Sequence, residues 1–365
     1  MKILHVTEAS AAGTLQVVRT LAARQAASGH VVTLAYADRP ETPADLPGIA
    51  AEGVEPIALG WARRSPFSQL AAGRALRRLV RERSPDVVHL HSSFAGAVGA
   101  LSLPRAVTLI YTPHGLAFVR TGVRRANRAT VRAVESLVAR RCTLLGAVSE
   151  AEAALARDGL HAPRVAVVRN GIPELDSPPV GTERAEPVVV ATGRIAEQRR
   201  PAATARILAA LAPAARVSWI GGGEDDAPLR EAGIPITGWL PREQALSRLA
   251  EATVYLHWSE WDGQSLAILE AIARDVVVVA SDIPANREVV GPRQVRADEE
   301  SAIALARRVL DDPALRAELL QDQRRRAPAF SATRMAADWL AMYERTVSAV
   351  APDRVSPTTA PVAGS

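Results

Sequence analysis

The stretch from Leu256 to Asn286 constrains the fold of this 365-residue chain more than any other. It predicts a short strand ending near His257, a polar turn, a helix from about Ser265, and a second apolar strand from Val276 to Ala280. The turn presents the carboxylate of Asp262 and several free backbone N–H groups at a helix N-terminus. These amides lack intrahelical partners and the helix dipole favours negative charge, so an anion binds readily at such a place.

A second carboxylate, Glu270, follows on the same helix. Seven residues separate Asp262 from Glu270, so one loop and one helix face can present two carboxylates to a single ligand. The pattern resembles the acid-x7-acid signature of the retaining glycosyltransferases of family four, whose GT-B architecture has two Rossmann-like domains. That family usually has glutamate where this chain has Asp262, and a second glycine where it has Ser265. Taken alone, the segment is also compatible with an ordinary amphipathic helix after an Asx turn.

The composition is typical of a soluble globular protein with room for two domains, with 48% hydrophobic and 23% charged residues. The net charge of +5 comes almost wholly from arginine, because Lys2 is the only lysine. This charge suits an anionic substrate or an acidic membrane surface, and no basic, aromatic-interleaved patch indicates nucleic acid. The single cysteine, Cys142, excludes an intrachain disulfide. No signal peptide or long apolar run is found, so we expect a cytoplasmic protein.

The chain opens with a predicted strand, Lys2 to Thr7, and a turn that contains Gly13 and Thr14 before a helix from about Leu15. The turn lacks a complete Gly-x-Gly-x-x-Gly pattern, so by itself it indicates a nucleotide only weakly. The resemblance implies that Gly13 and Thr14 lie against the donor diphosphate and the acceptor. A tight turn that merely leads into a helix is the alternative.

Two later strands are followed by histidines. His91 ends the strand that begins at Asp86, and His114 stands in the turn after the strand Val107 to Tyr111. Both fall at the carboxyl ends of predicted parallel strands, the edge at which open α/β sheets bind ligands. A lone histidine is usually structural, but two at one sheet edge favour a site. The resemblance implies that His114 lies beside the donor sugar.

The helix expected from Val123 to Arg141 carries six arginines and only one acidic residue, Glu135. A solvated helix face is the simpler interpretation. The alternative is a possible peripheral membrane contact, in which each basic residue near an anionic surface contributes roughly 1 kcal/mol.

A proline-rich linker from Glu174 to Glu186 leads to a second α/β half. Its first strand is followed by Arg194 and Arg199, at positions where the family has arginine and lysine. The resemblance implies that these two cations grip the donor diphosphate, as guanidinium groups do in bidentate fashion. Two exposed loop arginines are the alternative. Further on, Gly222 stands in a segment that resembles the Gly-x-Gly element near the nucleotide, and the residues from Ser281 to Glu288 are expected to form a loop.

The resemblance also assigns the central turn. It implies Glu270 on the ribose hydroxyls and Asp262 on the sugar hydroxyls. The resemblance further implies that the donor contacts the backbone of the turn and of the helix start, at Gly263, Gln264, Ser265 and Leu266.

We therefore predict an α/β fold of the GT-B type in four parts. An N-terminal Rossmann-like, acceptor-side domain spans residues 1–175, and a C-terminal Rossmann-like, nucleotide-sugar domain spans 186–330. A crossing helix, 331–348, packs on the N-terminal domain, and residues 351–365 form a disordered tail.

The predicted function is retaining, metal-independent hexosyl transfer from a UDP or GDP sugar to a hydroxyl of a glycan or lipid-linked glycan in polysaccharide or glycoconjugate synthesis. No cofactor and no metal are expected, since Asp225 and Asp226 are adjacent rather than spaced as a metal motif requires. Two alternatives remain open: a sugar-nucleotide epimerase of the same architecture, which needs no acceptor, and a non-catalytic sugar-nucleotide-binding protein. A dehydrogenase is disfavoured because the dinucleotide fingerprint is absent.

Overall fold

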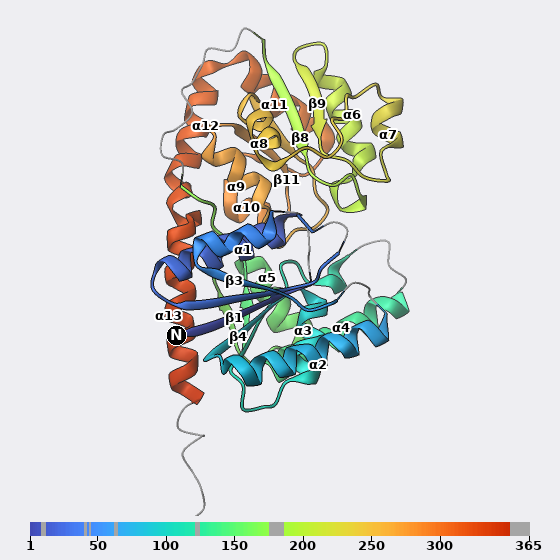
Figure 1. Ribbon diagram of the computed structural model, residues 1–365. Helices are drawn as coiled ribbons and strands as arrows, with labels where there is room; N and C mark the ends of the chain where they lie inside the picture. The colour runs from blue at the N-terminus through green and yellow to red at the C-terminus, as the bar shows by residue number, and fades with distance from the viewer. Residues whose placement is uncertain are drawn as a thin grey trace, which may run out of the picture.

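The computed structural model describes residues 1–8, 12–39, 42–43, 45–61, 65–120, 125–174 and 186–350. Two parallel β-sheets form two lobes, one above the other, and a long final helix runs down the side of the N-terminal lobe (Figure 1). The predicted α/β class with two Rossmann-like domains is confirmed. Residues 175–185 of the predicted linker and the predicted tail, residues 351–365, lie outside the described residues.

The first sheet is entirely parallel and has the order β3-β2-β1-β4-β5-β6-β7. Strands such as β4 are buried along their whole length because helices cover both faces, and this is why they are apolar runs rather than alternating ones. The strands are β1 (Lys2–Thr7), β2 (Val31–Tyr36), β3 (Val54–Ala58), β4 (Val87–His91), β5 (Leu109–Thr112), β6 (Leu144–Ala147) and β7 (Val165–Val167).

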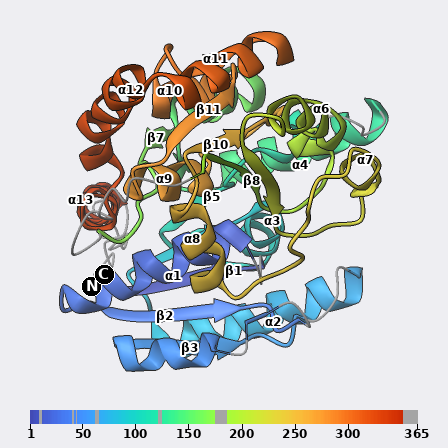
Figure 2. The same ribbon diagram turned by 90° about the horizontal axis from the view of Figure 1, so that it is seen from above.

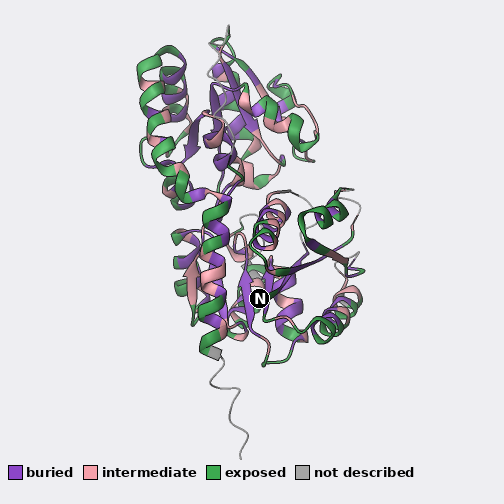
Figure 3. Ribbon diagram, turned by 60° about the vertical axis from the view of Figure 1, so that its left-hand side comes forward, coloured by how far each residue is buried: buried purple, intermediate pink, exposed green. Residues whose placement is uncertain are grey.

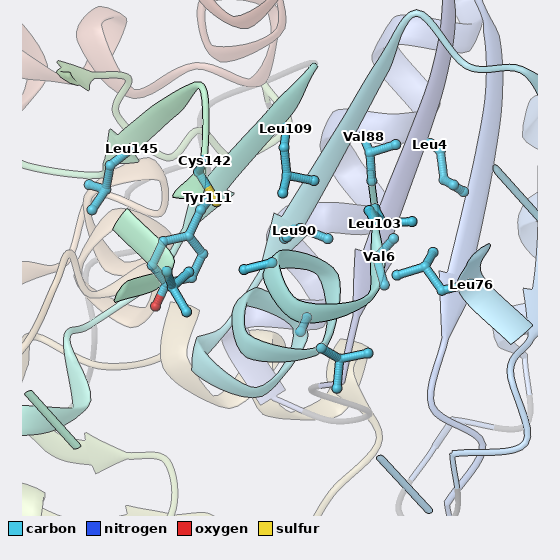
Figure 4. Close-up of a cluster of buried hydrophobic side chains, with 14 of the residues drawn as sticks. Leu4, Val6, Leu76, Val88, Leu90, Leu103, Leu109, Tyr111, Cys142 and Leu145 are labelled. Atoms are coloured by element: carbon cyan, nitrogen blue, oxygen red, sulfur yellow. The ribbon is translucent and has the colours of Figure 1, made fainter. Parts of the chain in front are cut away.

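Helices cover this sheet from both sides, as the view from above shows (Figure 2). On one face, Leu76, Val98 and Val138 of three helices pack on the strands in a continuous apolar core. Figure 4 shows part of this core, including Leu76 and the strand residues Val88 and Leu109. The core includes Cys142, and burial raises the pKa of its thiol to about 12, so this cysteine is a packing residue rather than a nucleophile. The helices of this lobe are α1 (Ala12–Ala27), α2 (Pro66–Arg83), α3 (Ser93–Ser102), α4 (Arg125–Arg141) and α5 (Glu150–Ala154).

The second sheet is also parallel, with the order β12-β11-β10-β8-β9. Its strands are likewise the most buried part of the lobe (Figure 3). They are β8 (Val188–Thr192), β9 (Arg216–Ile220), β10 (Val254–His257), β11 (Val277–Ser281) and β12 (Val295–Arg296). The helices are α6 (Pro201–Leu211), α7 (Ala227–Glu231), α8 (Arg242–Ala250), α9 (Leu266–Ala273), α10 (Pro284–Val290), α11 (Glu299–Asp311) and α12 (Pro313–Arg326).

The final helix, α13 (Ala332–Val350), crosses from the second lobe to the first. Its residues Met335, Trp339 and Tyr343 are buried in one cluster with apolar side chains of β1, α1, β4 and β5. None of the helices among the described residues is both long enough and apolar enough to span a bilayer.

Two local expectations are wrong. The predicted loop from Ser281 to Glu288 contains most of α10, which begins at Pro284. Proline is favoured at the first position of a helix, where its missing N–H costs nothing, so it marks a helix start here. Helix α1 begins at Ala12, so Gly13 and Thr14 lie in its first turn rather than in the preceding loop.

Candidate functional site

Loops that follow the carboxyl ends of strands in both sheets meet at the junction between the lobes. The Asn170 amide in the first lobe donates to the side-chain oxygen of Gln264 in the second at 2.6 Å. A Cβ atom placed on Gly263 would stand 2.9 Å from the amide nitrogen of Gly115. In each sheet the order of the strands changes direction at one point, between β1 and β4 in the first sheet and between β8 and β10 in the second. Open α/β sheets bind ligands at such switch points, so the junction is the candidate site.

The N-terminus of α9 carries unused hydrogen-bonding groups at this junction. Ser265 is the N-cap residue, yet its side chain makes no capping hydrogen bond. Its Oγ and the Nε2 of Gln264 are buried without a partner among the described residues. Ser265 is 3% exposed and Gln264 is 7% exposed, so little water reaches these atoms. An unpaired buried polar group costs about 1–3 kcal/mol. These groups and the first amides of α9 therefore indicate a site for a ligand rich in oxygen acceptors.

The N-termini of two helices lie side by side here. A Cβ atom on Gly13, in the first turn of α1, would be 3.7 Å from the Cβ of Leu266, the first residue of α9. Both dipoles thus present their positive ends to the junction. The structure brings the first turn of α1, which contains Gly13 and Thr14, close to Leu266. The expected contacts of Gly13 and Thr14 with the donor diphosphate and the acceptor remain predictions.

Asp262 is the centre of a buried ion cluster. It accepts hydrogen bonds from Arg199 Nη1 at 2.9 Å, His257 Nε2 at 2.9 Å and Ser259 Oγ at 3.2 Å, and its other oxygen accepts from Gln198 at 3.2 Å. Burial raises the pKa of Asp262, but the charge of Arg199 and these hydrogen bonds outweigh burial, so the pKa falls to about 2. Asp262 is therefore ionised at neutral pH and cannot donate a proton.

Arg199 and Asp262 neutralise each other in this arrangement. His257 stays uncharged beside them, because burial and the nearby Arg199 lower its pKa to about 4. The neutral His257 links these groups: its Nδ1 lies 2.7 Å from the Tyr255 hydroxyl, and its Nε2 lies 2.9 Å from Asp262 and 2.7 Å from Arg199 Nη1. The expected contacts of Arg199 with a diphosphate and of Asp262 with a sugar remain predictions.

Glu270 faces a cation that the sequence did not indicate. It is 9% exposed and forms an ion pair with Arg242, at the start of α8. A buried carboxylate is stable when its charge is paired in this way. Arg242 therefore fixes the position of the Glu270 carboxylate on α9, near the N-terminus of that helix.

The other predicted residues of the second lobe lie on the loops after β8 and β9. Arg194 is exposed and has no hydrogen-bond or ion-pair partner among the described residues, so its charge is available to a ligand. Gly222 lies against Trp239, since a Cβ at Gly222 would be 3.3 Å from the indole nitrogen. Trp239 is 63% exposed and offers an aromatic face beside this glycine loop.

On the opposite side, His114 occupies a left-handed backbone conformation, with φ at 53°. The following amide, of Gly115, donates to the carboxylate of Glu152 at 2.6 Å, and Glu152 also accepts from the Val148 amide at 2.8 Å. Burial raises the pKa of Glu152 to about 7. Glu135 anchors the next residues by accepting from the Ala117 amide at 3.0 Å. Two buried carboxylates thus hold the His114 turn against the junction.

Behind this turn lies a cluster of buried histidines. His5, His89 and His91 have ring nitrogens close enough together to share a metal ion. His89, however, already pairs with the hydroxyls of Tyr343 at 2.6 Å and Thr112 at 2.8 Å, and His5 pairs with His91 at 3.0 Å. Burial lowers the pKa of His5 to about 4 and those of His89 and His91 well below their ordinary value. We interpret the cluster as a network of neutral imidazoles whose hydrogen-bonding capacity is already used.

Sequence reasoning missed several residues of the site. His257 ends strand β10 at the carboxyl edge of its sheet, which is the same signal that singled out His91. Arg242 and Glu152 had no such signal, because each reaches the site from a helix whose placement depends on the whole lobe.

Two family models match the chain. Glycosyltransferase Family 4 covers residues 11–174, and Glycosyl transferases group 1 covers residues 186–311. A curated relative, the UDP-Gal:alpha-D-GlcNAc-diphosphoundecaprenol alpha-1,3-galactosyltransferase of Escherichia coli, is 26% identical over 59% of this chain. The alignment spans 62% of that relative, so the chain covers less than two thirds of its length.

Solved structures share the arrangement of both lobes. Sucrose-phosphate synthase from Thermosynechococcus elongatus superimposes with a TM-score of 0.82 at 19% identity, over 96% of this chain and 100% of that one. HepE from Anabaena, in complex with UDP-glucose, gives a TM-score of 0.72 at 15% identity, over 96% and 100% of the two chains. At these identities the similarity concerns the fold.

Proposed function

Because the chain belongs to the family-four glycosyltransferases of GT-B architecture, we propose that it transfers a hexose from a nucleoside-diphosphate sugar to a hydroxyl of a glycan or lipid-linked glycan. We favour a UDP sugar over a GDP sugar. The Escherichia coli relative uses UDP-Gal and a diphosphoundecaprenol-linked acceptor, and the HepE structure contains UDP-glucose. Both facts concern those proteins and support the choice for this one.

The observation that carries the proposal is the pair of buried, unpartnered groups at the start of α9, Ser265 Oγ and Gln264 Nε2. A diphosphate supplies the acceptors that these donors lack, and the α9 dipole adds a favourable field. The exposed Arg194 supplies a full positive charge for the same group. Trp239, beside Gly222, offers a surface on which the base can stack, and Glu270 is the proposed acceptor for ribose hydroxyls.

We propose a retaining reaction that requires no metal. Arg194 and the backbone amides at the start of α9 stabilise the negative charge of the diphosphate as it leaves. This is electrostatic catalysis by groups already in place. We assign no enzyme nucleophile: the departing phosphate accepts the proton of the attacking acceptor hydroxyl on the same face of the sugar. Asp262, ionised and held by Arg199, is the proposed acceptor for a hydroxyl of the donor sugar.

A thermal-shift and turnover experiment tests the proposal. UDP, GDP and ADP, each with and without its common sugars, are added to the wild type, to Ser265→Ala and to a control, Ser218→Ala on β9. A ligand at about 100 times its dissociation constant adds roughly 2.7 kcal/mol of apparent stability. We expect UDP to stabilise the wild type and the control, and Ser265→Ala to respond much less. Equal responses of all three proteins contradict the proposed phosphate site.

Product analysis with a stabilising sugar nucleotide separates the alternatives. Transfer of the sugar to an undecaprenyl-diphosphate-linked glycan, with the anomeric configuration kept, supports the proposal. An isomerised sugar in the absence of acceptor identifies an epimerase. Binding without turnover across a panel of acceptors identifies a non-catalytic binding protein.

We further propose peripheral contact with an anionic membrane through the outer faces of α2, α3 and α4. These helices pack side by side along the first lobe (Figure 1) and expose large apolar side chains: Phe67 (86%), Leu70 (54%), Leu101 (73%) and Leu137 (55%). Leu137 also lines a hollow of about 530 Å³ with five arginines that form no ion pair with a described carboxylate: Arg105, Arg140, Arg141, Arg164 and Arg345. Apolar side chains beside unpaired cations are what an anionic lipid surface attracts.

Vesicle co-sedimentation tests the membrane contact. We expect binding to vesicles with anionic lipid, little binding to neutral ones, and a clear loss in Phe67→Ser. The control Val31→Ser changes a residue that is 64% exposed at the start of β2 and belongs to none of these three helices, and it should bind as the wild type does. Equal sedimentation with neutral and anionic vesicles contradicts the proposal.

A further inference from the structure

A continuous hydrogen-bonded chain links the interior of α1 to the His114 turn. The side-chain oxygen of Gln25 lies 2.7 Å from His5 Nε2, and His5 Nδ1 lies 3.0 Å from His91 Nε2. His91 Nδ1 then lies 3.0 Å from His114 Nε2. Gln25 and His5 are fully buried and His91 is 1% exposed, so water does not interrupt these links. Both nitrogens of His5 and of His91 are used within the chain.

Each link constrains the next, because a neutral imidazole donates from one nitrogen and accepts on the other. Burial keeps these rings neutral by lowering their pKa values. With the Gln25 oxygen toward His5, the proton of His5 is on Nε2 and its Nδ1 accepts. His91 must then donate from Nε2 and accept on Nδ1, so His114 donates from Nε2. The remaining nitrogen of His114, Nδ1, keeps a free electron pair.

The orientation of the Gln25 side-chain amide therefore determines the tautomers of His5, His91 and His114. If the nitrogen of Gln25 faced His5 instead, all three rings would adopt the opposite tautomer, and His114 Nδ1 would carry a proton. A hydroxyl can donate to His114 Nδ1 only when the oxygen of Gln25 faces His5. The difference matters at the junction, because the turn that holds His114 contacts Gly263 through Gly115.

We propose that Gln25 is a positioning residue that fixes the tautomer of His114 through His5 and His91, so that His114 Nδ1 accepts a hydrogen bond from a hydroxyl of the bound sugar. The inference rests on the proposed glycosyl transfer for its catalytic consequence. The tautomer itself is a property of the free protein and is measured without any substrate.

Long-range proton–nitrogen NMR spectra of protein labelled with ¹⁵N-histidine test it. In the wild type we expect His114 with its proton on Nε2, the signal being assigned by its loss in His114→Gln. Gln25→Met removes the amide while keeping the length of the side chain, and should move a substantial fraction of the His114 proton to Nδ1. Gln16→Met is the matched control, since it makes the same change on the same helix at a residue whose side chain donates to Thr20 and, among the described residues, makes no contact with the histidines. It should leave the His114 signals unchanged.

Kinetics supply the second measurement. Loss of one aligned hydrogen bond to the sugar corresponds to about a tenfold fall in kcat/KM for the donor in Gln25→Met, with little change in Gln16→Met. An unchanged His114 tautomer in Gln25→Met overturns the proposal. A proton on His114 Nδ1 in the wild type overturns it too, and this decides the matter if Gln25→Met does not fold. If the tautomer shifts but no sugar transfer is found with any donor, the proposed function fails while the link from Gln25 to His114 stands.

Discussion

Gly263 of the second lobe stands so close to Gly115 of the first that a Cβ atom on it would lie 2.9 Å from the Gly115 amide nitrogen. The neighbouring atoms are backbone and the Val148 side chain, which cannot move aside as a flexible side-chain tip would. Glycine is therefore required at 263 to let the Asp262 turn and the His114 turn approach each other. The catalytic groups that the proposed reaction needs come from both turns.

Gly263→Ala should separate these turns while leaving both lobes folded. We expect kcat/KM to fall by roughly a hundredfold, the effect of a displacement of about 1 Å at a reacting centre. Gly48→Ala is the control, because a Cβ there meets no atom within 4 Å. Steady-state kinetics with the donor found by thermal shift provide the measurement. Wild-type rates in Gly263→Ala would contradict the requirement for close approach.

Because several histidines are buried and neutral, we expect the free energy of unfolding to decrease as the pH falls below neutral. Burial lowers the pKa values of His5, His114 and His257 from 6.5 to about 4. Between pH 6.5 and 4 the unfolded chain binds protons that the folded chain does not, so stability rises with pH in this window and falls as pH decreases through it. Each proton contributes about 1.4 kcal/mol per pH unit.

Glu152 opposes this trend, because its pKa is raised to about 7 and the folded state holds the extra proton between pH 4.5 and 7. Burial also raises the pKa of Glu135, which acts in the same direction as Glu152. These two carboxyls are outweighed by five buried histidines, His5, His89, His91, His114 and His257. We therefore expect the urea midpoint to fall steeply from pH 6.5 to pH 4.5. A flat profile over this range would show that the imidazoles are charged or accessible in the folded protein.

The sequence could predict the parts of the site that lie within one strand–turn–helix unit. The segment from β10 through the Asp262 turn to α9 is such a unit, and the positions of Asp262, Glu270, the free amides and the helix start follow from local spacing. The histidine cluster could not be predicted in this way. Its members meet because β4 pairs with β1 in the sheet, which places His89 directly opposite His5 although 84 positions separate them in the sequence. Pairing of Arg199 with Asp262 likewise depends on how β8 and β10 lie side by side.

Glu152→Gln tests how the His114 turn is held. The carboxylate accepts from the amides of Gly115 and Val148, whereas glutamine turns an NH₂ group toward one of these donors. A buried donor left without an acceptor costs about 1–3 kcal/mol, and the turn should loosen. We expect a lower melting temperature and a raised KM for the donor. Glu150→Gln, at an exposed position on the same helix, is the control and should change neither quantity.

Arg199 offers the sharpest test of the Asp262 cluster, because its charge and its geometry can be changed separately. Arg199→Gln removes the cation that lowers the pKa of Asp262 and leaves a buried carboxylate with only neutral partners. Breaking a buried ion pair in this way costs on the order of 3 kcal/mol. Arg199→Lys keeps the charge, with a shorter reach and fewer donors. We expect Arg199→Gln to lose both stability and transfer activity, and Arg199→Lys to keep most of its stability and part of its activity.

The pH dependence distinguishes the charge of Arg199 from its packing. In the wild type the Asp262 pKa of about 2 lies below its unfolded value of 3.8, so its stabilising contribution is complete above pH 3.8 and is lost as pH falls toward 2. In Arg199→Gln that pKa rises, so protonation should relieve the unpaired charge and the deficit relative to wild type should shrink as pH falls. Arg200→Gln, at the exposed neighbouring residue, should behave as the wild type does. A deficit in Arg199→Gln that is the same at every pH would show that packing, and not the ion pair, is what Arg199 contributes.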